Sequence, residues 1–190
     1  MNCCSNIARI WLVTLLCGMA SLTFADEVAE VNLLLKAGQT SEAMGKLDQF
    51  LTTKPKDPQL RFLKGIVLSD SKRTAEAIAV FTSLNEDYPE LPEPYNNLAV
   101  LYAGEGQYDK ARAALEAAVR GNPNYGTAYE NLGDVYTRLA AQAYARALVL
   151  DPTRAELPPK IAALRAQATA KPADARIAQP SPAAKSASSP

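Results

Sequence analysis

Two series of residues recur along the chain at one constant spacing. The alanines are Ala43, Ala77 and Ala111, and the prolines are Pro55, Pro89 and Pro123, so each step in both series equals 34. A repeat of this length is one supersecondary unit, which buries its apolar face only by stacking on its neighbours. The period therefore predicts an array of stacked units.

Small residues mark where two antiparallel helices of about 12 to 14 residues would cross within each unit. This position is occupied on the first helix by Gly65, Ala99 and Gly133, and on the second helix by the three alanines. The prolines end the second helices, because a proline cannot donate a hydrogen bond to the helix it follows. The sequence predicts helical hairpins.

The detailed pattern of the unit resembles the tetratricopeptide repeat. An aromatic residue, a leucine, a small residue and a tyrosine follow that family's spacing, and they are Tyr95, Leu98, Ala99, Tyr102 in one unit and Tyr129, Leu132, Gly133, Tyr136 in the next. The resemblance implies an all-α fold, with hairpins stacked in a right-handed superhelix, or α-solenoid. The repeats would be 26–57, 58–91, 92–125 and a shortened 126–152.

The first repeat departs from the pattern. Glu27 and Glu30 stand where the family places bulky groups. An atypical terminal repeat is typical of a solvent-facing cap.

The fourth repeat has lost the residues that should form its turn. The step from Ala111 to Ala140 is 29 instead of 34, and the step from Pro123 to Pro152 is shortened equally, so five residues are missing after Gly133. The remaining segment, TRLAAQA, contains no glycine, proline or asparagine. We therefore expect one fused helix from about Ala128 to Leu150; the alternative is a cramped turn near Leu139 and Ala140.

A last helix is expected after the repeats. The segment 155–167 places Leu157, Ile161 and Leu164 on one face and has prolines suited to a helix start. It would cap the fused helix within a region 153–169. Residues 170–190 are rich in Ala, Pro, Ser and Lys, which predicts a disordered tail.

Residues 1–25 have the composition of a secretory signal peptide. An apolar run, Ile10–Ala20, is shorter than a membrane-spanning helix, and small residues precede a cleavage point after Ala25. We expect export to the bacterial periplasm and no stable membrane insertion after cleavage; the alternative is a retained anchor.

The composition excludes several classes of function. Histidine is absent, and the three cysteines all lie within the predicted signal peptide. The mature chain would have no thiol or imidazole for catalysis or metal binding, so we expect no enzyme, no metal and no cofactor. Its 19 basic and 20 acidic residues, after removal of Arg9, predict no binding to nucleic acid.

The resemblance implies a concave wall of first helices that binds a partner segment. The inward positions would be Asn32, Phe62, Ile66, Ser69, Asn96, Asn97, Val100, Glu130, Asn131, Asp134, Thr137 and Arg138. Asn97 and Asn131 would hold peptide backbone, because an amide both donates and accepts; alternatively, they face solvent or bond a neighbouring helix. Because Arg138 is nearly alone beside Glu130 and Asp134, a mixed polar and apolar ligand is favoured over a terminal carboxylate.

The tyrosines of the pattern are expected to pack in the core rather than to contact a ligand. They are Tyr95, Tyr102, Tyr129 and Tyr136. The sequence therefore predicts a non-catalytic adaptor that binds a protein or peptide segment in its groove, with the partner's identity open. The alternative is an assembly factor that forms a homodimer, or docks, through the fused helix and the last helix.

Overall fold

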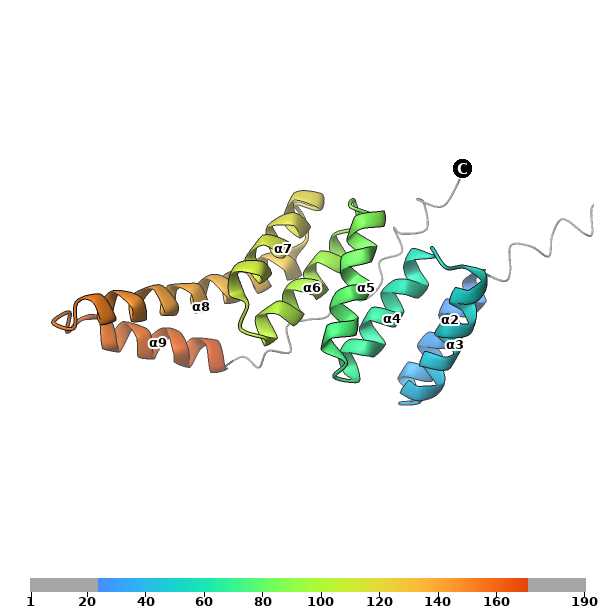
Figure 1. Ribbon diagram of the computed structural model, residues 1–190, viewed down its shortest axis with the longest axis horizontal. Coiled ribbons are helices and arrows are strands. Elements are labelled where there is room, and N and C mark those ends of the chain that lie inside the picture. The colour runs from blue at the N-terminus through green and yellow to red at the C-terminus, as the bar shows by residue number, and fades with distance from the viewer. Residues whose placement is uncertain (1–23, 171–190) are drawn as a thin grey trace, which may run out of the picture. The chain divides into compact units, whose positions relative to one another are not determined.

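The computed structural model describes residues 24–170, which form eight α-helices and no strand (Figure 1). The helices are α2 (Phe24–Lys36), α3 (Thr40–Thr53), α4 (Pro58–Asp70), α5 (Thr74–Asp87), α6 (Pro92–Gly104), α7 (Tyr108–Gly121), α8 (Gly126–Leu150) and α9 (Leu157–Ala170). The predicted all-α class is confirmed. The predicted leader, apart from its last two residues, and the predicted tail, apart from Ala170, lie outside the described residues.

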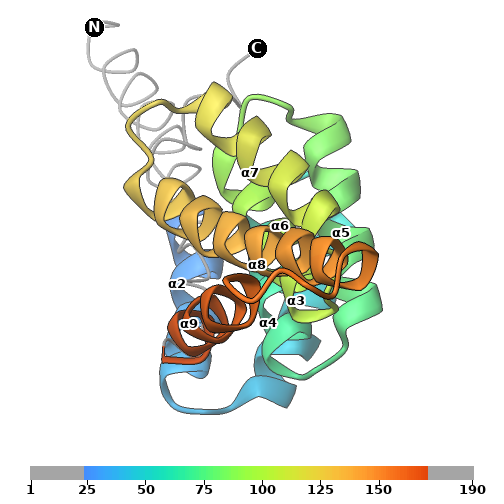
Figure 2. The same cartoon turned by 90° about the vertical axis from the view of Figure 1, so that its left-hand side faces the viewer.

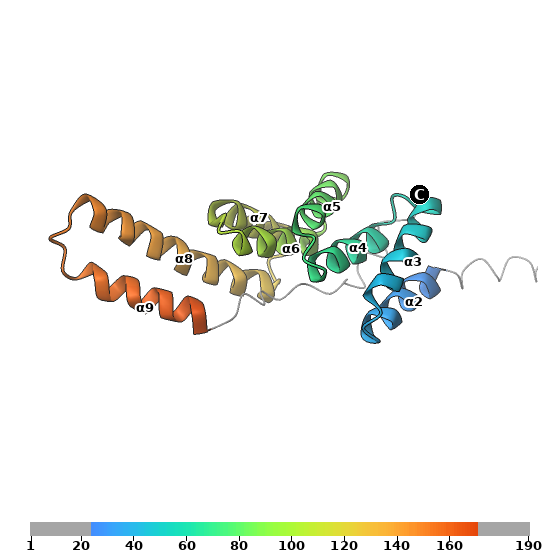
Figure 3. The same cartoon turned by 60° about the horizontal axis from the view of Figure 1, so that its bottom comes forward.

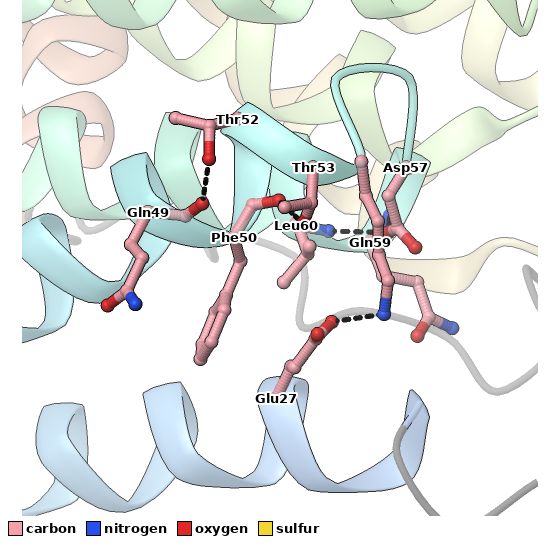
Figure 4. A network of polar contacts seen from close by, with 9 residues as sticks. Glu27, Gln49, Phe50, Thr52, Thr53, Asp57, Gln59 and Leu60 are labelled. Carbon is pink, nitrogen blue, oxygen red and sulfur yellow. Dashed lines mark hydrogen bonds and ion pairs between the residues drawn. The ribbon is translucent and has the colours of Figure 1, made fainter. Parts of the chain in front are cut away.

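The first compact unit ends at Pro55 and contains the hairpin of α2 and α3. Val31, Ala43 and Leu47 form its buried apolar centre. Two ion pairs cross the hairpin, from Glu30 to Lys46 and from Glu27 to Lys54, both at 2.7 Å. Glu27 projects from α2 towards the end of α3 (Figure 4). The positions where the resemblance expects bulky groups therefore carry the acidic partners of two ion pairs.

The second unit begins with a capped helix. Asp57 Oδ1 accepts hydrogen bonds from the backbone N–H groups of Gln59 and Leu60, each at 2.9 Å (Figure 4). Pro58 occupies the first turn, where its missing N–H costs nothing. These residues fix where α4 starts, because they satisfy N–H groups that have no partner within the helix.

The helix crossings in the second unit are close. A Cβ built on Gly65 of α4 would lie 2.6 Å from ring atoms of Phe81 on α5. Phe81 is buried and meets Phe62 edge to face, with ring centroids 5.6 Å apart. In the next hairpin, Ala99 and Ala111 are equally buried. The small residues of the sequence pattern therefore lie where the helices come together.

The three turns within the hairpins share one backbone conformation. Gly38, Lys72 and Gly106 occupy the same place in successive repeats and have φ angles of 74°, 61° and 73°. The residue after each donates its N–H to a carbonyl five residues back, as in Gln107 to Tyr102 at 2.8 Å. Lys72 is the non-glycine residue in this left-handed region, which L residues enter at a cost.

The fourth repeat has no such turn. α8 is a single helix of 25 residues, so the alternative of a cramped turn near Leu139 is wrong. α9 returns antiparallel along the second half of α8 and buries Leu157 and Ile161 (Figure 3). α7 and α9 lie on opposite sides of α8 (Figure 2).

The expectation that all four pattern tyrosines pack in the core is wrong for the fourth repeat. Tyr129 and Tyr136 are 50% and 47% exposed, whereas Tyr95 and Tyr102 are partly buried against the core of α6, α7 and α8. The reason is the fused helix. The second half of a straight helix cannot fold back to cover its own first half.

Candidate partner-binding surface

Three asparagines from the predicted groove form a buried ladder between α6 and α8. Asn96, Asn97 and Asn131 are 0%, 1% and 5% exposed. Asn131 Nδ2 donates to Asn96 Oδ1 at 2.8 Å, and Asn96 Nδ2 donates to Asn97 Oδ1 at 3.3 Å. The expectation that Asn97 and Asn131 offer free amides to a partner is wrong, and the alternative of a bond to a neighbouring helix holds for Asn131.

The ladder has a structural consequence. A buried amide without a partner costs about 1 to 3 kcal/mol, so the bonds between these side chains favour one register of α8 against α6. The asparagines thus position the surface around them and are not themselves exposed on it.

Two further predicted groove residues belong to the core. Phe62 and Ile66 on α4 are buried, and Phe62 packs on Phe81. Because both side chains are buried, they do not line an open wall. Asn32, in the first unit, is half-buried on α2.

Arg138 is engaged within the chain. Its Nη2 donates to the backbone carbonyl of Ala168 in the last turn of α9 at 3.1 Å, and Nη1 lies 3.4 Å from Tyr108 Oη. The guanidinium also lies over the Tyr108 ring, 5.6 Å from its centroid. A cation at a helix C-terminus is stabilising, because the last carbonyls carry partial negative charge. Arg138 therefore holds α9 in place, which corrects its predicted role as a groove cation.

The accessible part of the predicted groove is acidic and apolar. Glu130 and Asp134 on α8 are exposed, and Val100 on α6 is half-buried one helical turn past the asparagine ladder. We refer to Val100, Glu130 and Asp134 as the acidic face. Ser69 and Thr137 are half-buried, and Thr137 donates to the Gly133 carbonyl of its own helix at 3.0 Å.

A cleft lies beside the acidic face, between the start of α7, the second half of α8 and α9. Its volume is about 460 Å³, and its lining residues are Tyr108, Arg138, Ala141, Gln142, Ala145, Arg165 and Ala168. Sequence reasoning missed Tyr108 and Arg165 as members of one site. No spacing in the sequence could have joined them, because they meet only once α9 has packed on α8.

Within residues 24–170, no group of three or more acidic, histidine or cysteine side chains is placed to bind a metal ion. None of the helices described is both long enough and apolar enough to span a membrane.

Several solved structures have folds similar to that of this chain. The first TPR of Spaghetti (RPAP3), bound to the HSP90 peptide SRMEEVD, superposes with a TM-score of 0.57 at 17% identity, over 61% of this chain and 92% of that one. A crystal structure of the MamA protein gives a TM-score of 0.55 at 18% identity, over 80% of this chain and 85% of that one. These likenesses confirm the predicted fold class, an α-solenoid of stacked helical hairpins.

Sequence comparisons identify the family. The chain is 38% identical over 84 residues to the chloroplastic tetratricopeptide repeat domain-containing protein PYG7 of Arabidopsis thaliana, which covers 42% of this chain and 28% of that protein. The chain thus spans little more than a quarter of that relative's length. Two models described as tetratricopeptide repeat match residues 28–92 and 68–132 and together cover more than half of the chain. The chain therefore belongs to the tetratricopeptide repeat family.

Proposed function

We propose that this protein is a non-catalytic adaptor that binds a segment of a partner protein on the acidic face of its second unit. The observation that carries this proposal is the acidic face itself: two exposed carboxylates on α8 and a half-buried valine on α6, two helices joined by the hydrogen bond between the buried Asn131 and Asn96. Binding to such a preformed surface requires no bond to be made or broken.

The chemistry of the acidic face selects the kind of ligand. The solved relative binds a peptide, SRMEEVD, that is rich in carboxylates. Here Glu130 and Asp134 would repel such a peptide, and Arg138 is committed to α9. We therefore propose a segment that carries a basic residue for the two carboxylates and an apolar residue for Val100.

Site-directed photo-cross-linking tests the location of binding. A benzophenone amino acid at Thr137, one turn beyond Asp134 on α8, should cross-link a partner in the native host, whereas the same group at the exposed Glu86 of α5 should not. Mass spectrometry would identify the cross-linked segment. Equal capture at both positions would contradict a site on the acidic face.

Charge reversal then tests the chemistry with the identified segment. Glu130→Lys combined with Asp134→Lys should weaken its binding by about tenfold or more, and added salt should weaken binding to the unaltered chain. The matched control is Glu86→Lys with Glu90→Lys, which changes the net charge equally at exposed positions elsewhere. Equal loss in both pairs would show that net charge, and not this face, governs binding.

We also propose that the adaptor acts outside the bacterial cytoplasm. The support is the short apolar run followed by small residues at Thr23 and Ala25. Amino-terminal sequencing of the protein isolated from its host should begin at Asp26. A retained Met1 in the membrane fraction would instead indicate an anchor.

A further inference from the structure

One side of α8 carries a regular series of small, aromatic and aliphatic residues along its whole length. The members alternate spacings of three and four residues, which places them on one face of the helix, and they are Gly126, Tyr129, Gly133, Tyr136, Ala140, Ala143, Ala147 and Leu150. We refer to them as the α8 stripe. Six members are exposed, including Leu150 at 71%, and Ala140 and Ala147 are half-buried.

Two other sides of α8 pack on neighbouring helices, and outside the stripe Glu130, Asp134, Arg146 and Val149 are also exposed. Leu132 and Val135 face the core of α6 and α7, and Ala141 is buried on the α9 side. On the stripe, a Cβ built on Gly133 would meet no atom of another element within 4 Å. Apart from Tyr136 Oη, which donates to Glu116 Oε1 of α7 at 3.4 Å, most of the α8 stripe is left exposed by the described part of the chain.

The α8 stripe is complementary to itself when two copies run antiparallel about Arg138. Residues equally distant from position 138 then face each other across the pair, and each large side chain meets a small one. The facing pairs are Gly126 with Leu150, Tyr129 with Ala147, Gly133 with Ala143, and Tyr136 with Ala140. Alternating spacings of three and four are also the pattern of paired helices, and small residues let the axes approach closely.

The repeat itself explains why the two halves of α8 fit each other. Ala140, Tyr144 and Ala147 align with α7 residues that are fully buried in the third hairpin, namely Ala111, Leu115 and Ala118. The first half of α8 therefore corresponds to the first helix of a hairpin, and the second half corresponds to the second helix. Neither half is packed against the other as it would be in a closed hairpin. They cannot meet within one chain because they form one continuous helix.

The hairpin of α4 and α5 contains the contact that the fourth repeat lacks. Phe81 covers Gly65, and the aligned residues in the fourth repeat are Tyr144 and Gly133. In an antiparallel pair centred on Arg138, Gly133 of one copy faces Ala143 of the other, next to Tyr144. The register obtained from the stripe and the register obtained from the repeat agree to within one residue.

We propose that two copies of this chain form a symmetric dimer through antiparallel α8 helices, in which each copy completes the fourth hairpin of the other. The interface is the same patch on both copies, as a two-fold dimer requires. The dimer would present two acidic faces, so a partner with two binding segments would gain avidity. The dimer does not depend on the acidic face being a binding site.

Sedimentation equilibrium of the full chain, across micromolar concentrations, tests the dimer. We expect a mass of twice that of one chain, falling towards the monomer on dilution. Ala143→Glu places a carboxylate on the exposed stripe, where the dimer would bury it against Gly133, and should raise the dissociation constant about tenfold or more. The matched control, Ala113→Glu on the exposed side of α7, should leave the mass unchanged. Circular dichroism would confirm that both variants remain helical.

Disulfide trapping tests the register, in a chain whose Cys3, Cys4 and Cys17 are replaced by serine. Gly133→Cys with Ala143→Cys should give covalent dimers on oxidation, because these residues face each other between copies and lie about 15 Å apart within one helix. Gly126→Cys with Ala143→Cys is the control pair, since neither cysteine faces the other between copies, and should remain monomeric on a non-reducing gel.

Three results would overturn the proposal. One is a monomer at all concentrations, including the case in which the α8 stripe is covered by a helix of a different protein. Another is a dimer that survives Ala143→Glu as well as it survives Ala113→Glu. The third is a control cysteine pair that cross-links as efficiently as the predicted pair.

Discussion

Gly65 and Gly133 occupy the same position of the repeat and have opposite surroundings. At Gly65 the ring of Phe81 lies 2.6 Å from the place a Cβ would take, whereas at Gly133 no atom of another element lies within 4 Å. The glycine is a steric requirement in a closed hairpin and has no such role in an open one. The same sequence pattern therefore has different physical meaning in the second and fourth repeats, and the presence of a turn decides which.

Restoring the missing turn should produce the largest change. Inserting Gly-Gln-Tyr-Asp-Lys between Leu139 and Ala140 supplies the turn that the third repeat uses at 106–110. We expect α8 to divide into a hairpin, α9 to be displaced, and Gly133 to become covered as Gly65 is. Amide hydrogen exchange should then become fast within the insert, whereas residues 138–142 of the unaltered chain should exchange slowly. Slow exchange throughout the inserted segment would mean that the helix simply lengthens.

The next largest effect is a difference in stability loss between Phe81 and Tyr144, which occupy the same position in the second and fourth repeats. Phe81→Ala removes a buried ring and should lower the free energy of unfolding by about 3 to 5 kcal/mol. The aligned change Tyr144→Ala should cost about 1 kcal/mol or less in the monomer, because that ring is partly exposed and its described contact is with Lys160, 5.6 Å from the ring centroid. Urea denaturation of dilute protein measures both values. Similar losses would show that the fourth repeat is closed.

Alanine at the two glycines should change stability in opposite directions. Gly65→Ala forces a methyl group against Phe81 and should cost about 1 to 3 kcal/mol. Gly133→Ala meets no obstacle and removes a helix-interior glycine, so it should stabilise the monomer by about 0.5 to 1 kcal/mol. Chemical denaturation measures the free energy of unfolding of both variants. Changes of the same sign would contradict the contrast between a covered Gly65 and an open Gly133.

Replacing Arg138 should destabilise the end of α9, the helix that packs on α8 in place of a second helix of the fourth repeat. Arg138→Gln removes the charge at the C-terminus of α9 and the stacking on Tyr108, at a cost of about 1 kcal/mol. Exchange should quicken in the last turn of α9 and stay unchanged in α4 and α5. As a control, Arg146→Gln at an exposed position of α8 should change stability by no more than about 0.5 kcal/mol.

The smallest effect on stability is expected in the turn between α4 and α5. Lys72 has the left-handed backbone that Gly38 and Gly106 have in the equivalent turns. Lys72→Gly should stabilise the chain by about 0.5 to 1 kcal/mol, because glycine enters this region without a steric penalty. A decrease in melting temperature would indicate that the Lys72 side chain makes a compensating contact.

Much of the secondary structure could be predicted from the sequence. The fused helix was expected from about residue 128 to 150 and runs from 126 to 150, and the last helix was expected over 155–167 and runs from 157 to 170. The last helix begins two residues later than predicted, with Pro158 and Pro159 in its first turn, and ends three residues later, beyond the Ala168 carbonyl that accepts from Arg138. The site was predicted less well: Asn97, Asn131 and Arg138 lie on the expected helices, but their side chains bond within the chain.

The sequence by itself determined the hairpins, their crossings and the loss of the fourth turn, because these depend on local spacing, on small residues at close contacts and on residues that can break a helix. Only the tertiary structure decided which side chains remain exposed. Whether Asn131 faces solvent depends on the distance to Asn96 on another helix, and whether Tyr129 is covered depends on a helix that folds elsewhere. Exposure is a property of pairs of elements brought together by packing, and a spacing along one chain does not contain it.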